Sequence, residues 1–321
     1  MPGNIVAGSL RTGPDGRPLL LVLRALQLGD LLVAVPALHA LRRAYPGHRL
    51  VYAGPAWLRD AVDLVGGYEL LPTPGLLEPL AVDQGMVDIA VNLHGRGPES
   101  QVLIEAVGAR RVISHASDRR DGPDWTEDIH ERRRWTRMLQ WHGITADPDD
   151  VGLPAAPVRT RHPDATLVHV GAAFGSRLWP ADRFADVASR LAESGHRVLL
   201  TGSAAERARA LAVAEQAGLP EEAVLAGGLS LGEFIALVAE ARLVISADTG
   251  AAHLATAYRR PSVVLFGPAR PELWEPPPGP HAVLTKAELR RGDPFAGDPD
   301  PALLGVRVQE VLDAVRGLGL L

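Results

Sequence analysis

The sequence predicts an α/β protein of two Rossmann-like domains, each built on a doubly wound parallel sheet. Continuous apolar runs of strand length alternate with segments of helical period in both halves of the chain. A segment rich in Pro and Asp, residues 145–164, has neither period and separates the two halves. Strands that are joined through helices run parallel within one sheet. We therefore expect domains at residues 19–150 and 165–295.

The first domain begins with PLLLVLRAL, an almost wholly apolar run that is typical of a strand covered on both faces. Helical spacing follows in DLLVAVPALHALRRAYPG. Three further runs predict strands: HRLVYAG, VDIAVNLHG and ARRVIS. A segment rich in Arg, His and Trp then predicts a helix with Trp135, Met138 and Leu139 inward, or else an acceptor-facing surface. Gly and Pro in residues 1–18 indicate a loose N-terminal extension.

The second domain repeats this alternation. Its expected strands are DATLVHVGAA, HRVLLTG, EEAVLAGG, RLVISAD and SVVLFG, and the segments between them have helical spacing or are short. Residues 300–321 predict an amphipathic C-terminal helix, whose apolar face has to pack against another element. The first domain is one surface on which it can pack.

Composition excludes several classes of function. The net charge of −5 gives no support to nucleic-acid binding or to a polybasic membrane patch. The absence of cysteine excludes disulfides, zinc–thiolate sites and thiol catalysis. No apolar run reaches the roughly 20 residues that span a bilayer, and the start lacks the features of a signal peptide. We expect a cytoplasmic protein with no transmembrane segment, and the oligomeric state is not readable from the sequence.

Ligands of open α/β sheets bind beyond the carboxyl ends of the strands, so the residues that follow each strand are the candidates. In the first domain, Gly29 and Asp30 lie between the first strand and its helix. Asp30 either caps that helix or presents a carboxylate that can take a proton from a hydroxyl group. No G-x-G-x-x-G dinucleotide fingerprint is present here.

Two strands of the second domain are followed by charged candidates. Arg177 lies in a loop of small residues, where it can form two hydrogen bonds with a phosphate or extend into solvent. Glu206 lies at a helix start, where it can accept two ribose hydroxyls or complement the helix dipole.

The stretch ISADTGAAH, residues 245–253, combines a strand end with a bare helix start. Free N–H groups at Thr249, Gly250, Ala251 and Ala252 would form an anion site, with Asp248 and His253 beside it. The alternative is a core histidine with a capping aspartate. Metal binding has weak support, since Asp248 and His253 are poorly spaced for one helical face, and no G-x-S-x-G motif supports a Ser-His-Asp triad.

Taken in order, these motifs resemble the heptosyltransferase family of bacterial glycosyltransferases, which pass heptose from ADP-heptose to the lipopolysaccharide core. The similar stretches are LVLRALQLGDLLVAVPALHALRRAYPGHRLVYAG, VGAAFGSRLWPADRFADVASRL and VISADTGAAHLATAYRRPSVVLFGPARPELWEP, within residues 19–290. The resemblance implies the GT-B architecture, two Rossmann-like domains facing a cleft, with acceptor bound by the first domain and nucleotide-sugar donor by the second. It also implies inverting transfer to a hydroxyl on a glycan, a lipopolysaccharide-type core or a natural product, with no required metal or other cofactor.

Residue by residue, the resemblance makes Asp30 the base. It assigns donor binding to second-domain residues: Arg177, Glu206, Asp248, Thr249, Gly250, Ala251 and His253. Arg24, Asn92 and His94 are the acceptor-side candidates, with Asn92 standing where an acid is common. Two other functions stay open. A nucleotide-sugar epimerase of related fold would turn over the donor alone, and a non-catalytic nucleotide-sugar-binding protein would give no product.

Overall fold

The computed structural model describes residues 16–321, and the chain divides into two compact units between Val151 and Gly152. Each unit is described by itself. Most of the expected N-terminal extension, residues 1–15, lies outside the described residues. The first strand begins at Leu19.

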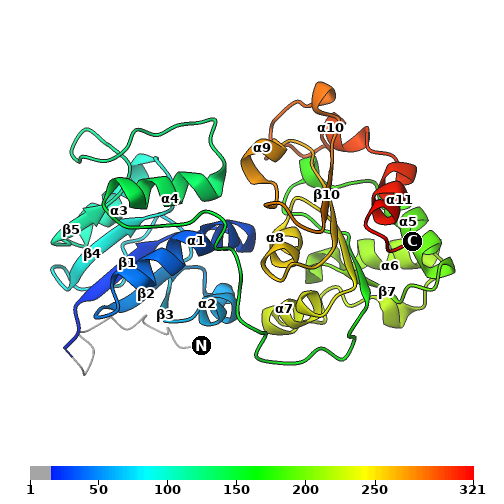
Figure 1. The fold of residues 1–321 in the computed structure, drawn as a ribbon, viewed down its shortest axis with the longest axis horizontal. Helices are drawn as coiled ribbons and strands as arrows, with labels where there is room; N and C mark the ends of the chain where they lie inside the picture. Colours follow the sequence, from blue (N-terminus) through cyan, green and yellow to red (C-terminus); the bar gives the residue numbers. More distant parts are fainter. Residues whose placement is uncertain (1–15) are drawn as a thin grey trace, which may run out of the picture. The chain divides into compact units, whose positions relative to one another are not determined.

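The first unit contains a five-stranded sheet in the order β3-β2-β1-β4-β5, with every neighbouring pair parallel (Figure 1). Its strands are β1 (Leu19–Leu23), β2 (Arg49–Gly54), β3 (Tyr68–Pro72), β4 (Val87–Asn92) and β5 (Arg111–Ile113). Its helices are α1 (Leu28–Ala44), α2 (Arg59–Val65), α3 (Pro98–Ala106) and α4 (Glu131–Trp141). All five residues of β1 are buried, which explains why an uninterrupted apolar run forms a central strand.

The chain leaves β1 toward β2 on one side of the sheet and returns to β4 on the other side. The strand order therefore reverses between β1 and β4, and this switch point is where open α/β sheets bind ligands. Helix α4 packs against α1 and buries Trp135, Met138 and Leu139, which confirms the inward-facing helix expected there.

The second unit contains a second five-stranded parallel sheet, in the order β10-β9-β8-β6-β7. The strands are β6 (Thr166–His169), β7 (Val198–Thr201), β8 (Leu243–Ala247), β9 (Ser262–Leu265) and β10 (His281–Leu284). The helices are α5 (Ala181–Glu193), α6 (Arg207–Gln216), α7 (Leu231–Ala239), α8 (Gly250–Ala257), α9 (Pro271–Trp274), α10 (Pro301–Leu304) and α11 (Val308–Gly317). Here the order reverses between β6 and β8. The predicted fold class, two doubly wound parallel sheets, is confirmed.

The C-terminal helix α11 belongs to the second unit. Val311, Leu312 and Val315 are buried in the core that also contains residues of α5, β6 and β9, and α11 packs against α5. The first domain, named as one surface for this helix, is not where these side chains lie. They fill the second unit because a five-stranded sheet needs both faces covered.

Several elements differ from the expectation. The segment EEAVLAGG forms a 3₁₀ turn at Glu221–Ala223 and a single bridge from Val224 to Leu200, so the strand predicted there is wrong. A positive φ of 74° at Gly227 turns the chain before a ladder can form. The edge strands β3 and β10 and the helices α2 and α3 were not anticipated.

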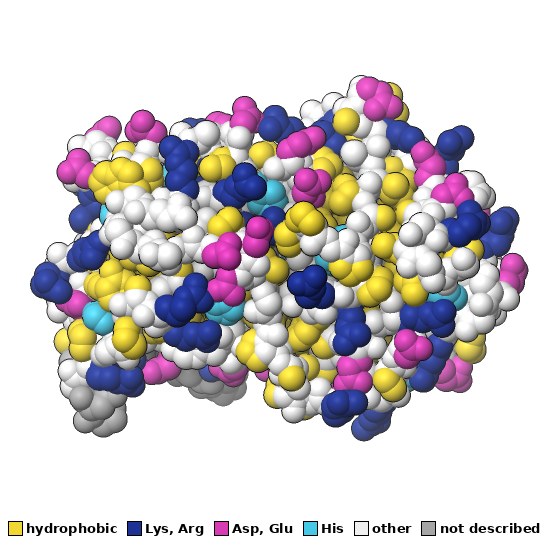
Figure 2. All heavy atoms as spheres, in the orientation of Figure 1, with side chains coloured by type: hydrophobic (Ala, Val, Ile, Leu, Met, Phe, Trp, Pro, Cys, Tyr) yellow, Lys and Arg dark blue, Asp and Glu magenta, His cyan; other side chains and the backbone are white. Residues whose placement is uncertain are grey.

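The surface carries both signs of charge. On the face that Figure 2 shows, Lys and Arg side chains are interspersed with Asp and Glu side chains, as the small net charge leads one to expect. Within residues 16–321, no helix is long and apolar enough to cross a membrane.

Candidate active site

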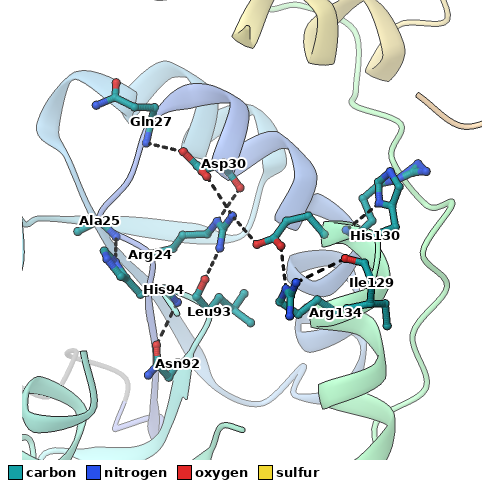
Figure 3. A network of polar contacts seen from close by, with 12 residues as sticks. Arg24, Ala25, Gln27, Asp30, Asn92, Leu93, His94, Ile129, His130 and Arg134 are labelled. Carbon is teal, nitrogen blue, oxygen red and sulfur yellow. Dashed lines mark hydrogen bonds and ion pairs between the residues drawn. The ribbon is translucent and has the colours of Figure 1, made fainter. Parts of the chain in front are cut away.

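Arg24 organises the switch point of the first unit. It follows β1, and its side chain is wholly buried. Its Nε donates to the backbone oxygen of Asp30 at 2.6 Å, and its Nη1 donates to the backbone oxygen of Leu93 after β4. The guanidinium thus joins the two loops that leave the sheet on either side of the switch point (Figure 3).

The same guanidinium lies between two carboxylates. Its Nη2 is 3.5 Å from Asp30 Oδ1 and 3.7 Å from Glu131 Oε1 on α4, and its Cζ lies 5.0 Å from the centre of the Trp135 ring. Glu131 in turn pairs with Arg134 at 2.8 Å. A buried cation of this kind needs such partners, because an unpaired buried charge is strongly destabilising.

Asp30 lies in the first turn of α1, which begins at Leu28, two residues earlier than expected. Its Oδ2 accepts a hydrogen bond from the Gln27 backbone N–H at 3.2 Å, and its Oδ1 faces Arg24. The side chain remains 26% exposed. The capping geometry and an accessible carboxylate therefore coexist at this position, and the two interpretations of Asp30 are not exclusive.

The three acceptor-side candidates are placed differently from one another. Arg24 is 0% exposed and Asn92 is 3% exposed, so both side chains are buried. Asn92 instead shapes the loop after β4, because its Oδ1 accepts the His94 N–H and its Nδ2 donates to Ser100 Oγ. His94 alone of the three is partly exposed.

Glu131 was not singled out from the sequence. It follows Arg24 by more than a hundred positions in the chain, in a helix that the sequence describes only as amphipathic. A charged residue at the start of a helix is usually a response to the helix dipole, so only the tertiary packing of α4 against α1 reveals its pairing with Arg24.

In the second unit, three predicted residues meet at the switch point. Arg177 follows β6, and Asp248 and His253 follow β8. Arg177 Nη1 is 3.6 Å from Asp248 Oδ2, and His253 Nε2 is 3.6 Å from Asp248 Oδ1. Asp248 is 4% exposed, so its carboxylate is held between two basic side chains in a largely dry position.

The start of α8 offers hydrogen-bond donors beside this cluster. Thr249 is the N-cap residue, and Ala252 N–H bonds back to the Thr249 carbonyl at 3.1 Å. The first N–H groups of a helix have no partner within it, and here Gly250 and Ala251 carry no bulky side chain over them. The Thr249 hydroxyl is buried without a hydrogen-bond partner among the described residues. This arrangement suits an anion that brings its own acceptor oxygens.

Glu206 lies against the loop after β6. Its Oε2 accepts the Ser203 N–H at 2.6 Å, and a Cβ atom placed on Gly171 would come within 2.0 Å of the Glu206 carboxylate. Loss of hydration lowers the pKa of the neighbouring His169, while the negative charge of Glu206 opposes that shift. Gly171 is therefore the residue that lets Glu206 reach the end of β6.

A late segment of the chain holds the loop that carries Arg177. We name residues 290–300 the bracket. Ser176 N–H donates to the Ala296 carbonyl at 2.9 Å, and Ser176 Oγ donates to the Pro294 carbonyl at 2.8 Å. Gly175 is needed for this approach, because a Cβ there would lie 1.7 Å from the Gly297 carbonyl oxygen. The position of Arg177 thus depends on residues more than a hundred positions later.

Within residues 16–321, no group of three or more His, Asp or Glu side chains is arranged to hold a metal ion. Asp248 and His253 do lie together, but the third group in contact with Asp248 is the cation Arg177, which is not a metal ligand. The described polar clusters suit an anionic ligand better than a cationic one.

Comparison with known proteins agrees with this geometry. Residues 147–291 match the model of Glycosyltransferase family 9 (heptosyltransferase). The chain is 39% identical over 200 residues to lipopolysaccharide heptosyltransferase 1 of Pseudomonas aeruginosa, covering 60% of this chain and 55% of that protein. It is 29% identical over 157 residues to lipopolysaccharide heptosyltransferase 2 of Escherichia coli, covering 46% and 44%. These alignments span about half the length of the curated relatives.

The fold extends further than these alignments. The solved structure of E. coli ADP-heptose lps heptosyltransferase II superposes with a TM-score of 0.72 at 19% identity, covering 93% of this chain and 98% of that one. A more distant fold relative, with a TM-score of 0.61 at 17% identity, is TibC of enterotoxigenic E. coli, described as an iron-containing dodecameric glycosyltransferase. The resemblance read from the sequence is confirmed: residues 147–291 match the model of glycosyltransferase family 9, the heptosyltransferase family, and the fold is that of a solved heptosyltransferase.

Proposed function

We propose that the protein is an inverting glycosyltransferase that moves heptose from ADP-heptose to a hydroxyl group of a lipopolysaccharide-type glycan. The observation that carries the proposal is the cluster of Arg177, Asp248 and His253 at the start of α8. It lies at the switch point of the sheet, within the segment that matches family 9. The relatives' printed names supply the donor and the acceptor class.

The second unit is assigned to the donor. Arg177 and the first N–H groups of α8 would bind the diphosphate, whose negative charge grows as the glycosidic bond breaks. Thr249 has an unpartnered hydroxyl for a donor oxygen, and Glu206, at the neighbouring strand end, can accept hydroxyls of the nucleoside. No metal is assigned a role, and the family resemblance supports transfer without one.

The first unit is assigned to the acceptor. Asp30 takes the proton of the acceptor hydroxyl as that oxygen attacks the anomeric carbon, and ADP leaves with the electrons of the broken C–O bond. The partly exposed carboxylate fixed by Gln27 and Arg24 supports this role. We place this chemistry in the cytoplasm, as the sequence leads us to expect.

The proposal is tested in two steps. Thermal shift with ADP-heptose, UDP-sugars and GDP-sugars identifies the donor, because a ligand at 100 times its Kd stabilises the folded state by about 2.7 kcal/mol. The protein is then incubated with ADP-heptose alone and with ADP-heptose plus a heptose-free lipopolysaccharide core. We expect a heptosylated product only with the acceptor. Epimerised donor in the first tube, or binding with no product in either, would contradict transfer.

Replacing Gly171 by Ala should weaken donor binding without unfolding the protein. The new methyl group would displace the Glu206 carboxylate, which lies at the flexible end of a side chain and can move away. Losing hydrogen bonds to a charged group costs about 1.5–3 kcal/mol, so the Kd for ADP-heptose should rise roughly tenfold or more. Isothermal titration calorimetry measures this change.

Gly152→Ala is the matched control, because no atom lies within 4 Å of the position that its Cβ would occupy. Its Kd should equal that of the wild type. An unchanged Kd in Gly171→Ala, with the fold intact, would remove Glu206 from the donor site.

A further inference from the structure

We propose that His94 binds the acceptor by donating a hydrogen bond from Nε2 to an acceptor oxygen next to the hydroxyl that Asp30 deprotonates. This inference deepens the proposed function and rests on it. His94 is a positioning residue in this role, because it orients the acceptor and exchanges no proton with it.

The backbone and ring of His94 are fixed from three directions (Figure 3). The Ala25 N–H donates to His94 Nδ1 at 3.2 Å, and the His94 N–H donates to Asn92 Oδ1 at 3.0 Å. The preceding carbonyl, that of Leu93, accepts a hydrogen bond from Arg24. Such a preorganised side chain loses little conformational freedom when a ligand binds.

These contacts determine which ring nitrogen carries the proton. Nδ1 accepts the Ala25 N–H, so in the neutral imidazole the hydrogen is on Nε2. Among residues 16–321, Nε2 has no hydrogen-bond partner, and His94 is partly exposed. The ring therefore presents one N–H donor outward and has no free lone pair with which to act as a base.

The ring is also uncharged near neutral pH. Burial first and the Arg24 cation second lower the pKa of His94, and with the opposing charge of Glu99 included that pKa is about 4. A neutral N–H donor pairs well with a hydroxyl or ether oxygen and lacks the charge that would favour a carboxylate or phosphate. The ligand chemistry that fits is therefore a sugar oxygen.

Asp30 and His94 are complementary and are held by the same residue. Arg24 contacts Asp30 through Nη2 and the residue before His94 through Nη1. One side chain accepts a hydrogen and the other donates one, and they follow the two strands that flank the switch point. In the proposed complex, one oxygen of the acceptor gives its proton to Asp30 and a second oxygen accepts a hydrogen bond from His94.

Two conservative variants separate this role from a structural one. In His94→Gln the amide Nε2 takes the place of the ring Nε2, so the outward donor is kept. In His94→Asn the amide oxygen takes the place of Nδ1, so the bond from Ala25 is kept and the outward donor is lost. With a heptose-free lipopolysaccharide core as acceptor, we expect kcat/KM for the acceptor to fall about tenfold in His94→Asn. The loss in His94→Gln should be smaller, with KM for ADP-heptose unchanged in both.

The opposite ranking, with His94→Asn near the wild type and His94→Gln impaired, would show that His94 only supports the Ala25 backbone and would overturn the inference. Nitrogen-15 NMR of histidine-labelled wild-type protein at pH 7 adds a readout that needs no activity. The signal that disappears in His94→Gln should be that of the Nε2–H tautomer, and an Nδ1–H tautomer or an imidazolium would also overturn the inference. If the wild type transfers no heptose at all, the proposed function itself is contradicted. That result is distinct from the opposite ranking of the variants and from a different His94 tautomer.

Discussion

Asp30→Asn should abolish most of the transfer activity while leaving donor binding intact. A general base contributes about 10²–10⁴-fold to rate, so kcat should fall by roughly that factor. Asparagine keeps an oxygen that can accept the Gln27 N–H, so the start of α1 should survive the change. The measurement is steady-state transfer from ADP-heptose, beside calorimetric binding of ADP-heptose to the same sample.

The second unit offers a matched control for the capping role of Asp30. Glu233 occupies the corresponding position in α7, where its Oε2 accepts the Ser230 N–H at 2.8 Å. Glu233→Gln removes the same kind of charge from the same helical position and should leave kcat unchanged. If Asp30→Asn also transfers heptose at nearly the wild-type rate, Asp30 is a cap and the base is another group.

Arg24→Met should produce the largest loss of stability. It removes the only described partner of the Leu93 carbonyl and leaves the carboxylates of Asp30 and Glu131 without their shared cation. Removing one partner of a buried ion pair lowers the free energy of unfolding by about 3–5 kcal/mol. Urea denaturation monitored by tryptophan fluorescence measures this, since Trp135 lies against the guanidinium.

Arg110→Met provides the comparison for Arg24. Arg110 also pairs with a carboxylate, that of Asp88 at 2.6 Å, but its side chain is 78% exposed. Water screens such a pair, so the urea midpoint should hardly move. Equal midpoints for the two variants would mean that the Arg24 network contributes nothing beyond an exposed ion pair.

Much of the fold can be predicted from the sequence, because the buried strands of parallel sheets are uninterrupted apolar runs. LLLVL and LVISA become central strands with every residue buried. The edge strand YELLP mixes buried and exposed residues without strict alternation and ends in proline, so its signal is short and ambiguous. The rule that ligands bind beyond strand ends was enough to bring Arg177, Asp248 and His253 into one hypothesis, and the structure brings them together.

Other parts of the site depend on contacts that sequence spacing does not contain. The sequence does not distinguish Arg24 from other charged residues that follow a strand. Its burial is revealed by the structure, in which α4 packs against α1. The tautomer of His94 depends on a single backbone N–H from another loop. The packing partner of α11 could not be predicted either. An amphipathic pattern indicates that the apolar face of a helix is covered, but it does not indicate which surface covers that face.

The bracket determines where a fragment containing the second unit should end. The family match ends at residue 291, whereas the carbonyls that hold Ser176 belong to residues 294 and 296. A fragment trimmed to the matched region would keep Arg177 and residues 245–253 but would lose the backbone carbonyls that hold the loop of Arg177. The segment that matches the family model is thus shorter than the unit that folds, so a fragment of the proposed donor domain should extend to the end of α11.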